Sequence, residues 1–181
     1  MAKAPKKTTR KAKAPAKRAA PPLARASSKA LAKPLREGII IEPVHPGKPL
    51  PIHNMPFVPA FSVQGGRTLW LSGMGPLPIY HKHPHDPVEE AQWYEGDFRD
   101  QCWKTFKNIE RILNAGGADM TNIVKITEYL VNVMRDQDVL NEITWEIWGK
   151  ENMPPRTLVE IPSLAHKDML LEIDVIAQIP G

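Results

Sequence analysis

The sequence predicts an α+β fold, in which one sheet is covered on one face by two helices. Residues 153–179 contain two strand-like runs separated by a short polar loop, and residues 97–114 carry apolar side chains at helical spacing. The elements follow one another as strand, helix, strand, helix, strand, strand. Helices that alternate with strands in this way bury the apolar face of both layers, which defines the class.

Charge divides the chain into two parts. Residues 1–36 hold twelve Lys or Arg and no acidic residue, whereas residues 37–181 hold twelve basic and twenty acidic residues. The first part has no aromatic residue and cannot bury enough apolar surface to offset the entropy of ordering. We therefore predict a disordered basic tail over 1–36. It could bind nucleic acid or another polyanion weakly, act as a solubilising segment, or serve as a transit peptide.

A proline-rich stretch follows the tail, with seven prolines between Pro34 and Pro59. Proline forbids a helix interior and disfavours a central strand. We expect an extended connector over 37–60, with a short edge strand at 38–41, ahead of a folded domain at 61–181.

The first strand of the domain is predicted at 67–72, after the turn at Gly65-Gly66. A long loop with several prolines then covers 74–96, and loops of this length are usually functional or mobile. The best helix is 97–114, capped by Asp97 and ended by a second glycine pair. The lone cysteine, Cys102, lies in the apolar stripe of this helix, so we interpret it as a core residue.

A second strand is predicted at 122–131 and a second helix at 138–150, capped by Asp138. Two terminal strands are predicted at 156–161 and 169–179. Each has one apolar face, which we expect to pack on the helices.

The other face of each terminal strand is mixed in character. It carries Arg156 in the first strand, and Glu172 and Asp174 in the second. Mixed faces are seldom left open to solvent, so we expect subunit contact there.

Three strings in this order resemble the RidA/YjgF family of reactive-intermediate deaminases: LWLSGMGPLP, the helix-and-strand segment FRDQCWKTFKNIERILNAGGADMTNIVKITEYLVN, and MPPRTLVEIPSLAHKDMLLEIDVIA. The resemblance covers about residues 56–179. It implies a chorismate-mutase-like fold, a homotrimer with active sites between subunits, and neither metal nor organic cofactor. We also expect a cytoplasmic location. The implied reaction hydrolyses enamines and imines, such as 2-aminoacrylate and its imine tautomer, to 2-keto acids and ammonia. No membrane partner is implied.

Residue by residue, Arg156 matches the family arginine that binds the substrate carboxylate, and Glu172 matches the glutamate that positions the attacking water. We also expect Ser72 and Gly73, in the turn after the first strand, to bind substrate. A guanidinium can hold a carboxylate through two parallel hydrogen bonds, and a carboxylate can orient water and accept its proton. Arg156 could instead pair with Glu172 or Glu160 across the sheet, and Asp174 could replace Glu172.

Two positions depart from the family pattern. Phe61 stands where a tyrosine is common, and Leu158 stands where many members have a cysteine. Both changes make the cleft more apolar and favour a larger imino acid. An aminomuconate-type deaminase therefore stays open, as does a non-catalytic metabolite-binding or nucleic-acid-associated trimer.

The string HKHPHD, which holds His81, His83 and His85, resembles a metal-ligand cluster. A structural zinc site needs four well-placed ligands, which a proline-containing loop rarely preorganises. We therefore interpret this segment as a solvated loop without a metal.

Overall fold

A computed structural model of the chain describes residues 37–48 and 55–181. The predicted basic tail, residues 1–36, lies outside the described residues, as does part of the connector. Within the described residues, no helix is long and apolar enough to cross a membrane.

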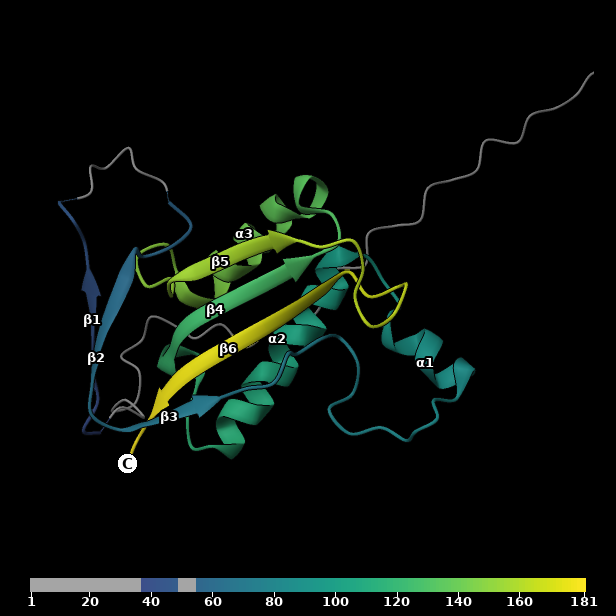
Figure 1. Ribbon diagram of the computed structural model, residues 1–181, viewed down its shortest axis with the longest axis horizontal. Coiled ribbons are helices and arrows are strands. Elements are labelled where there is room, and N and C mark those ends of the chain that lie inside the picture. Colours follow the sequence, from purple (N-terminus) through teal and green to yellow (C-terminus); the bar gives the residue numbers. More distant parts are fainter. Residues whose placement is uncertain (1–36, 49–54) are drawn as a thin grey trace, which may run out of the picture.

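The centre of the fold is a four-stranded sheet with the order β3-β6-β4-β5 (Figure 1). Its strands are β3 (Arg67–Trp70), β4 (Ile123–Leu130), β5 (Arg156–Glu160) and β6 (Leu171–Ile179). Strand β6 is antiparallel to both of its neighbours, whereas β4 and β5 are parallel. A parallel pair needs a long crossover, and the helix α3 (Val133–Trp148) supplies it.

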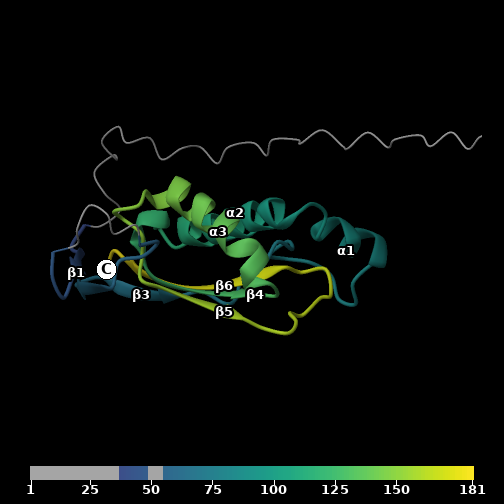
Figure 2. The same ribbon diagram turned by 90° about the horizontal axis from the view of Figure 1, so that it is seen from above.

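Both long helices, α2 (Phe98–Ala115) and α3, cover the same face of the sheet (Figure 2). Among the described residues, no helix covers the other face. The core lies between the two layers. Cys102, Phe106 and Ile109 of α2 are fully buried there, as is every second residue of β6 from Leu171 to Ile179. The predicted α+β class, the buried Cys102 and the apolar face of the last strand are thus confirmed.

The start of α2 follows its prediction, and the start of α3 does not. Asp97 caps α2 and exchanges hydrogen bonds with Asp100 in a capping box. In contrast, α3 begins at Val133, five residues before the expected cap at Asp138. Its real cap is Asn132, whose side chain accepts a hydrogen bond from the Arg135 amide at 3.0 Å.

The proline-rich connector is more ordered than expected. Strands β1 (Ile40–Val44) and β2 (Ala60–Gln64) pair antiparallel in a small separate sheet. This pair lies beyond the C-terminal end of β6 (Figure 1). The short edge strand was predicted, but its partner was not. Pro43 is accommodated because β1 pairs on one side only.

The long loop contains the short helix α1 (Pro87–Trp93), which was not predicted. Asp86 caps it by accepting from the Val88 amide at 2.8 Å. The buried side chain of Gln101 in α2 joins this segment to the start of β6. Its amide donates to the carbonyls of Tyr94 and Asp168, both at 2.9 Å, and its oxygen accepts from the Leu170 amide at 3.0 Å.

Candidate active site

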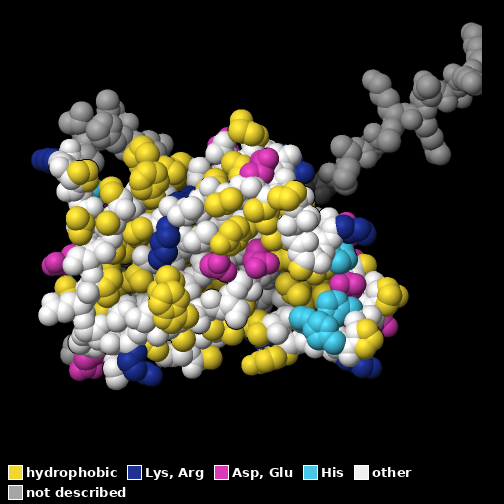
Figure 3. Space-filling view, viewed as in Figure 1, with side chains coloured by type: hydrophobic (Ala, Val, Ile, Leu, Met, Phe, Trp, Pro, Cys, Tyr) yellow, Lys and Arg dark blue, Asp and Glu magenta, His cyan; other side chains and the backbone are white. Residues whose placement is uncertain are grey.

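Two carboxylates, Glu172 and Asp174, lie on the sheet face that the helices leave open. Glu172 pairs in register with Tyr129 of β4. The Tyr129 hydroxyl donates a hydrogen bond to Asp174 Oδ2 at 3.2 Å. Figure 3 shows this face, where a few charged side chains lie among hydrophobic ones.

The electrostatics of this pair favour a proton on Glu172. Partial burial raises the pKa of its carboxyl group, and the negative charge of Asp174 raises it further. The pKa of Tyr129 is also raised, first by Asp174 and then by burial. Within the described residues neither carboxylate forms an ion pair. Glu172 therefore has the character of an acid–base group that can exchange a proton.

Gly73 lies directly against Glu172. A Cβ atom at this position would overlap the Glu172 carboxylate and would lie 3.2 Å from Asp174 Oδ1. Only a residue without a side chain allows this close approach of backbone to carboxylate. The bridge between Met74 and Ile173 holds the segment in place, with hydrogen bonds of 2.9 Å in both directions. The exposed Ser72 precedes Gly73.

A pocket of about 140 Å³ opens beside this turn, lined by Gly73, Met74, Ile79, His81 and Asn108 among others. The Asn108 side chain, from α2, donates to the carbonyls of Gly75 at 3.0 Å and Leu77 at 2.7 Å. These two hydrogen bonds tie the loop that follows Gly73 to α2.

Arg156 lies on the opposite face of the sheet, which corrects the face we assigned to it. Its side chain is only 5% exposed, and its guanidinium forms two parallel hydrogen bonds to the buried Glu128, at 2.8 and 2.9 Å. A third bond, of 2.8 Å, reaches Asn141 of α3. Burial raises the pKa of Glu128, and the charge of Arg156 opposes that shift. Arg156 pairs with neither Glu172 nor Glu160.

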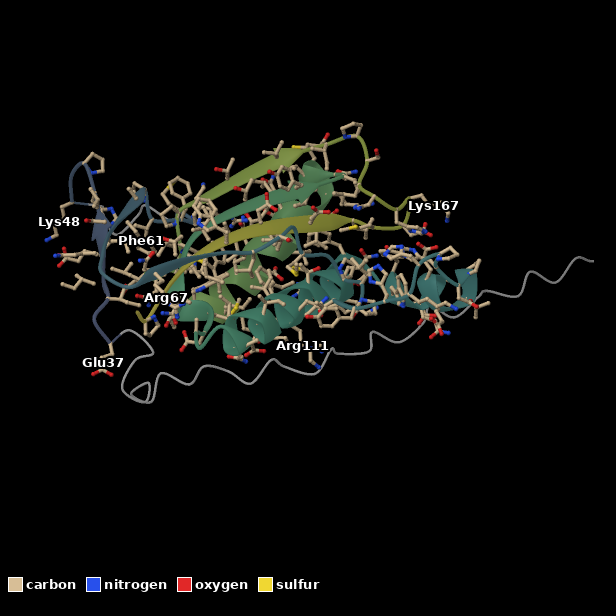
Figure 4. All side chains as sticks on the ribbon, turned by 60° about the horizontal axis from the view of Figure 1, so that its bottom comes forward. Glu37, Lys48, Phe61, Arg67, Arg111 and Lys167 are labelled. Carbon is tan, nitrogen blue, oxygen red and sulfur yellow. The ribbon has the colours of Figure 1, made fainter. Side chains whose placement is uncertain are left out.

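The other predicted site residues are also separated within one chain. Leu158 is half-buried and packs against the core, while Phe61 belongs to β2. Figure 4 shows Phe61 at one end of the molecule and Lys167, in the turn before β6, at the other. The structure thus brings Gly73 to Glu172, and leaves Arg156, Leu158 and Phe61 elsewhere.

Sequence reasoning missed Glu128, Tyr129, Asn141 and Lys125. Glu128 could have been found from the sequence. It lies on the same buried face of β4 as Ile126 and Leu130, where an unpaired charge is costly. Tyr129 and Lys125 share a strand with it, but nothing in their spacing marks them. Lys125 donates to Thr157 Oγ1 at 2.6 Å.

A family model described as Endoribonuclease L-PSP matches residues 51–179. A RutC family protein of Pyrococcus horikoshii is 34% identical over 116 residues, covering 64% of this chain and 82% of the relative. The chain belongs to the RidA/YjgF family. The human protein named 2-iminobutanoate/2-iminopropanoate deaminase is 31% identical over 111 residues, which are 61% of this chain and 72% of that protein.

Solved structures of RidA/YjgF proteins share the fold. RidA from an Antarctic Psychrobacter is 26% identical, with a TM-score of 0.51, and the match covers 76% of this chain and 93% of that one. A Rid family protein of Yersinia pestis has a TM-score of 0.59 at 19% identity, covering 77% and 98% of the two chains. The second likeness concerns the fold alone.

Proposed function

We propose that the protein hydrolyses reactive enamines and imines to 2-keto acids and ammonia, with Glu172 as the group that positions water and exchanges its proton. One observation carries this proposal. Glu172 is a half-buried carboxyl group of raised pKa, held against the backbone of Gly73. The names of relatives such as the human imine deaminase support the same reaction.

The chemistry needs one carboxyl group and one water. Ionised Glu172 accepts a proton from water as the water oxygen bonds to the imine carbon, and the electron pair of the C=N bond moves to nitrogen. Return of that proton gives an amino group. Glu172 then carries a second proton, from the new hydroxyl group to this nitrogen, so that the nitrogen can leave as ammonia. When the C–N bond breaks, the hydroxyl oxygen forms the new carbonyl, so that imine and water give a keto acid and ammonia. A carboxyl group of raised pKa suits both transfers.

Arg156 enters this proposal only across a contact between two copies of the chain. Within one chain Arg156 and Glu172 face opposite sides of the sheet. A cleft between subunits could join the Arg156 side of one copy to the Glu172 side of another. Three N–H groups of the guanidinium are engaged by Glu128 and Asn141. The other two N–H groups have no hydrogen-bond partner among the described residues, and a substrate carboxylate would have to reach them there.

The open sheet face supports association between copies. Trp70, 72% exposed, lies on this face opposite Ile176 of β6. Aromatic side chains are enriched in protein–protein interfaces. We propose a homotrimer, as the family resemblance implies.

The first test follows the disappearance of imines made in situ by an amino-acid oxidase, with semicarbazide as the trap. Arg156→Lys and Glu172→Gln would be assayed separately and after unfolding and refolding together. Lysine keeps a positive charge beside Glu128 but cannot form the two-pronged bond.

If the site is shared between copies, neither variant is active alone, and the mixture recovers about a quarter of the wild-type sites. No recovery, with mixed trimers confirmed by mass spectrometry, would show that the two residues do not act together across an interface. No acceleration by the wild-type trimer with any imine would overturn the deaminase proposal. The apolar Phe61 and Leu158 favour larger imines, so aminomuconate-type substrates belong in the same panel.

A non-catalytic metabolite-binding protein is the second candidate. The observation that favours it is the engagement of Arg156 by Glu128, with the Arg156 side chain only 5% exposed. Binding of 2-keto acids measured by calorimetry, without imine turnover, would support this alternative. Nucleic-acid binding through residues 1–36 stays a prediction for gel-shift measurement.

A further inference from the structure

Three histidine side chains meet on the surface near α1. The ligand-capable nitrogens of His81, His83 and His85 all lie within 4.8 Å of one another. Their ring centroids are 4.5 to 4.8 Å apart. Figure 3 shows histidine side chains gathered in one patch at this end of the molecule. We propose that these three residues, the histidine cluster, bind one divalent transition-metal ion of the zinc class.

Two of the three rings are held in the tautomer that a metal requires. His81 Nδ1 lies 2.9 Å from the Pro78 carbonyl, which can only accept, so Nδ1 carries the proton. His85 Nδ1 lies 2.6 Å from Glu90 Oε1. In both rings Nε2 is left with its lone pair free. A metal-binding histidine typically donates its other N–H to a carbonyl or carboxylate in this way.

His85 Nε2 supplies an independent sign of a missing ligand. This atom is buried, and within the described residues no hydrogen-bond partner reaches it. A buried polar atom without a partner is costly and calls for an explanation. A metal ion at the centre of the histidine cluster would satisfy it.

The loop that carries the cluster is not the unstructured segment that the sequence suggested. Helix α1 brings Glu90 back to His85, and Trp93 packs on two of the rings, with centroids 5.1 Å from His81 and 5.0 Å from His85. His83 is exposed, so its side chain can move toward the other two. Two ligands are therefore preorganised, and the third closes the site.

The chemistry of the donors selects the metal. Imidazole suits zinc, copper and nickel, whereas magnesium and calcium prefer oxygen. Zinc bound at about 2.0–2.1 Å holds its nitrogen ligands about 3.4 Å apart, so a modest movement of His83 completes the geometry. Three protein ligands leave a fourth position for water.

His166 is near but is not proposed as a ligand. Its Nδ1 accepts from the Asp168 amide at 3.1 Å, which leaves the proton on Nε2, 3.9 Å from Glu90. The ring also stacks on Tyr94, with centroids 4.2 Å apart. His81, in contrast, belongs to both the cluster and the pocket beside Gly73. A bound metal would therefore stiffen one wall of that pocket, whether or not the protein is a deaminase.

The test titrates untagged, chelator-treated protein with Zn²⁺ by calorimetry, and with Co²⁺ by visible absorption. We expect one ion per chain and a Co²⁺ spectrum typical of nitrogen ligands in low coordination number. Mg²⁺ should not compete. The direct variant is His83→Ala, which removes an exposed ligand with little risk to folding. The matched control is His45→Ala, an exposed histidine outside the cluster.

A second variant, Glu90→Gln, tests the support of His85 and should weaken binding about 10- to 100-fold. His83→Ala should weaken it at least as much, and His45→Ala should leave it unchanged. Zn²⁺ binding that is absent in the wild type, or equal in the wild type and His83→Ala, would overturn the proposal. Thermal melts with and without Zn²⁺ provide a readout that is independent of any enzyme activity.

Discussion

Each face of the sheet holds one carboxyl group whose pKa is raised by burial. The two groups differ in the charge of their nearest neighbours. On the covered face, Glu128 has a guanidinium bonded to both of its oxygens. On the open face, Glu172 has a second acid, Asp174, as its charged neighbour. The comparison teaches that a compensated charge holds a fold together, whereas an uncompensated one stays available for chemistry.

Removing the cation from the covered face should have the largest effect. Arg156→Ala leaves the buried Glu128 without its partner, and we expect a loss of about 3–5 kcal/mol in the free energy of unfolding. Urea denaturation followed by tryptophan fluorescence measures it. The double variant Arg156→Met/Glu128→Leu should recover most of this loss, since no unpaired charge remains. A loss below about 1 kcal/mol would mean that the pair is not buried in solution.

Removing the carboxylate from the open face should affect activity instead. Glu172→Gln keeps the shape but cannot accept a proton, so we expect a loss of about 10²- to 10⁴-fold in kcat with imine substrates. Stability should not fall. Glu146→Gln, on the exposed side of α3, is the matched control and should keep full activity. Equal activity in both variants would assign proton transfer to another group.

A pH profile sharpens the contrast. Glu172 has a folded-state pKa above that of the unfolded chain, so its contribution to stability is present at low pH and is lost as pH rises through the folded value. Activity should show the opposite trend, because the base must be ionised. Asp174→Asn removes a charge that raises this pKa. The acidic limb of the kcat profile should therefore move to lower pH. A shift to higher pH would contradict the proposed coupling.

The smallest effect is expected from an exposed ion pair. Arg99 and Glu142 join α2 to α3, with side chains 40% and 60% exposed. Solvent screens such pairs, so Arg99→Ala should cost between 0 and about 1 kcal/mol. The losses in the free energy of unfolding of Arg99→Ala and Arg156→Ala would be measured under the same urea conditions. The difference between the two losses gives the effect of burial on an arginine–glutamate pair.

Local pattern predicted much of the fold because the relevant forces are local. The capping box at Asp97 and the alternation of buried and half-buried side chains along β6 both depend on residues that are close in the sequence. The face of Arg156 was assigned wrongly, since the side chain follows a partner 28 residues away in the chain, Glu128, rather than the polarity of its own strand. The start of α3 was missed although its cap, Asn132, is a residue type that favours this position. The Val133 amide donates to Glu160, a distant residue, at 2.8 Å.

The candidate site was less predictable than the fold. The resemblance indicated Glu172 and Gly73, and their contact depends on the bridge between Met74 and Ile173, which no spacing reveals. The histidine cluster was discounted because its loop was expected to lack structure, and α1 supplies that structure. Contacts between segments that are far apart in the chain cannot be predicted from a single sequence.

The hydrogen bonds of Gln101 couple the local motions of two segments of the fold. One buried amide side chain bonds the residue after α1, the turn near Asp168 and the entrance to β6. The segment around α1 and the segment that enters β6 are both bonded to this one side chain. If either segment moves away from Gln101, the hydrogen bonds of the other are disturbed as well. We therefore expect both to exchange their amide hydrogens as one cooperative unit, with matching opening rates. The loop that carries the histidine cluster and the strand that carries Glu172 would then open and close in one local unfolding event.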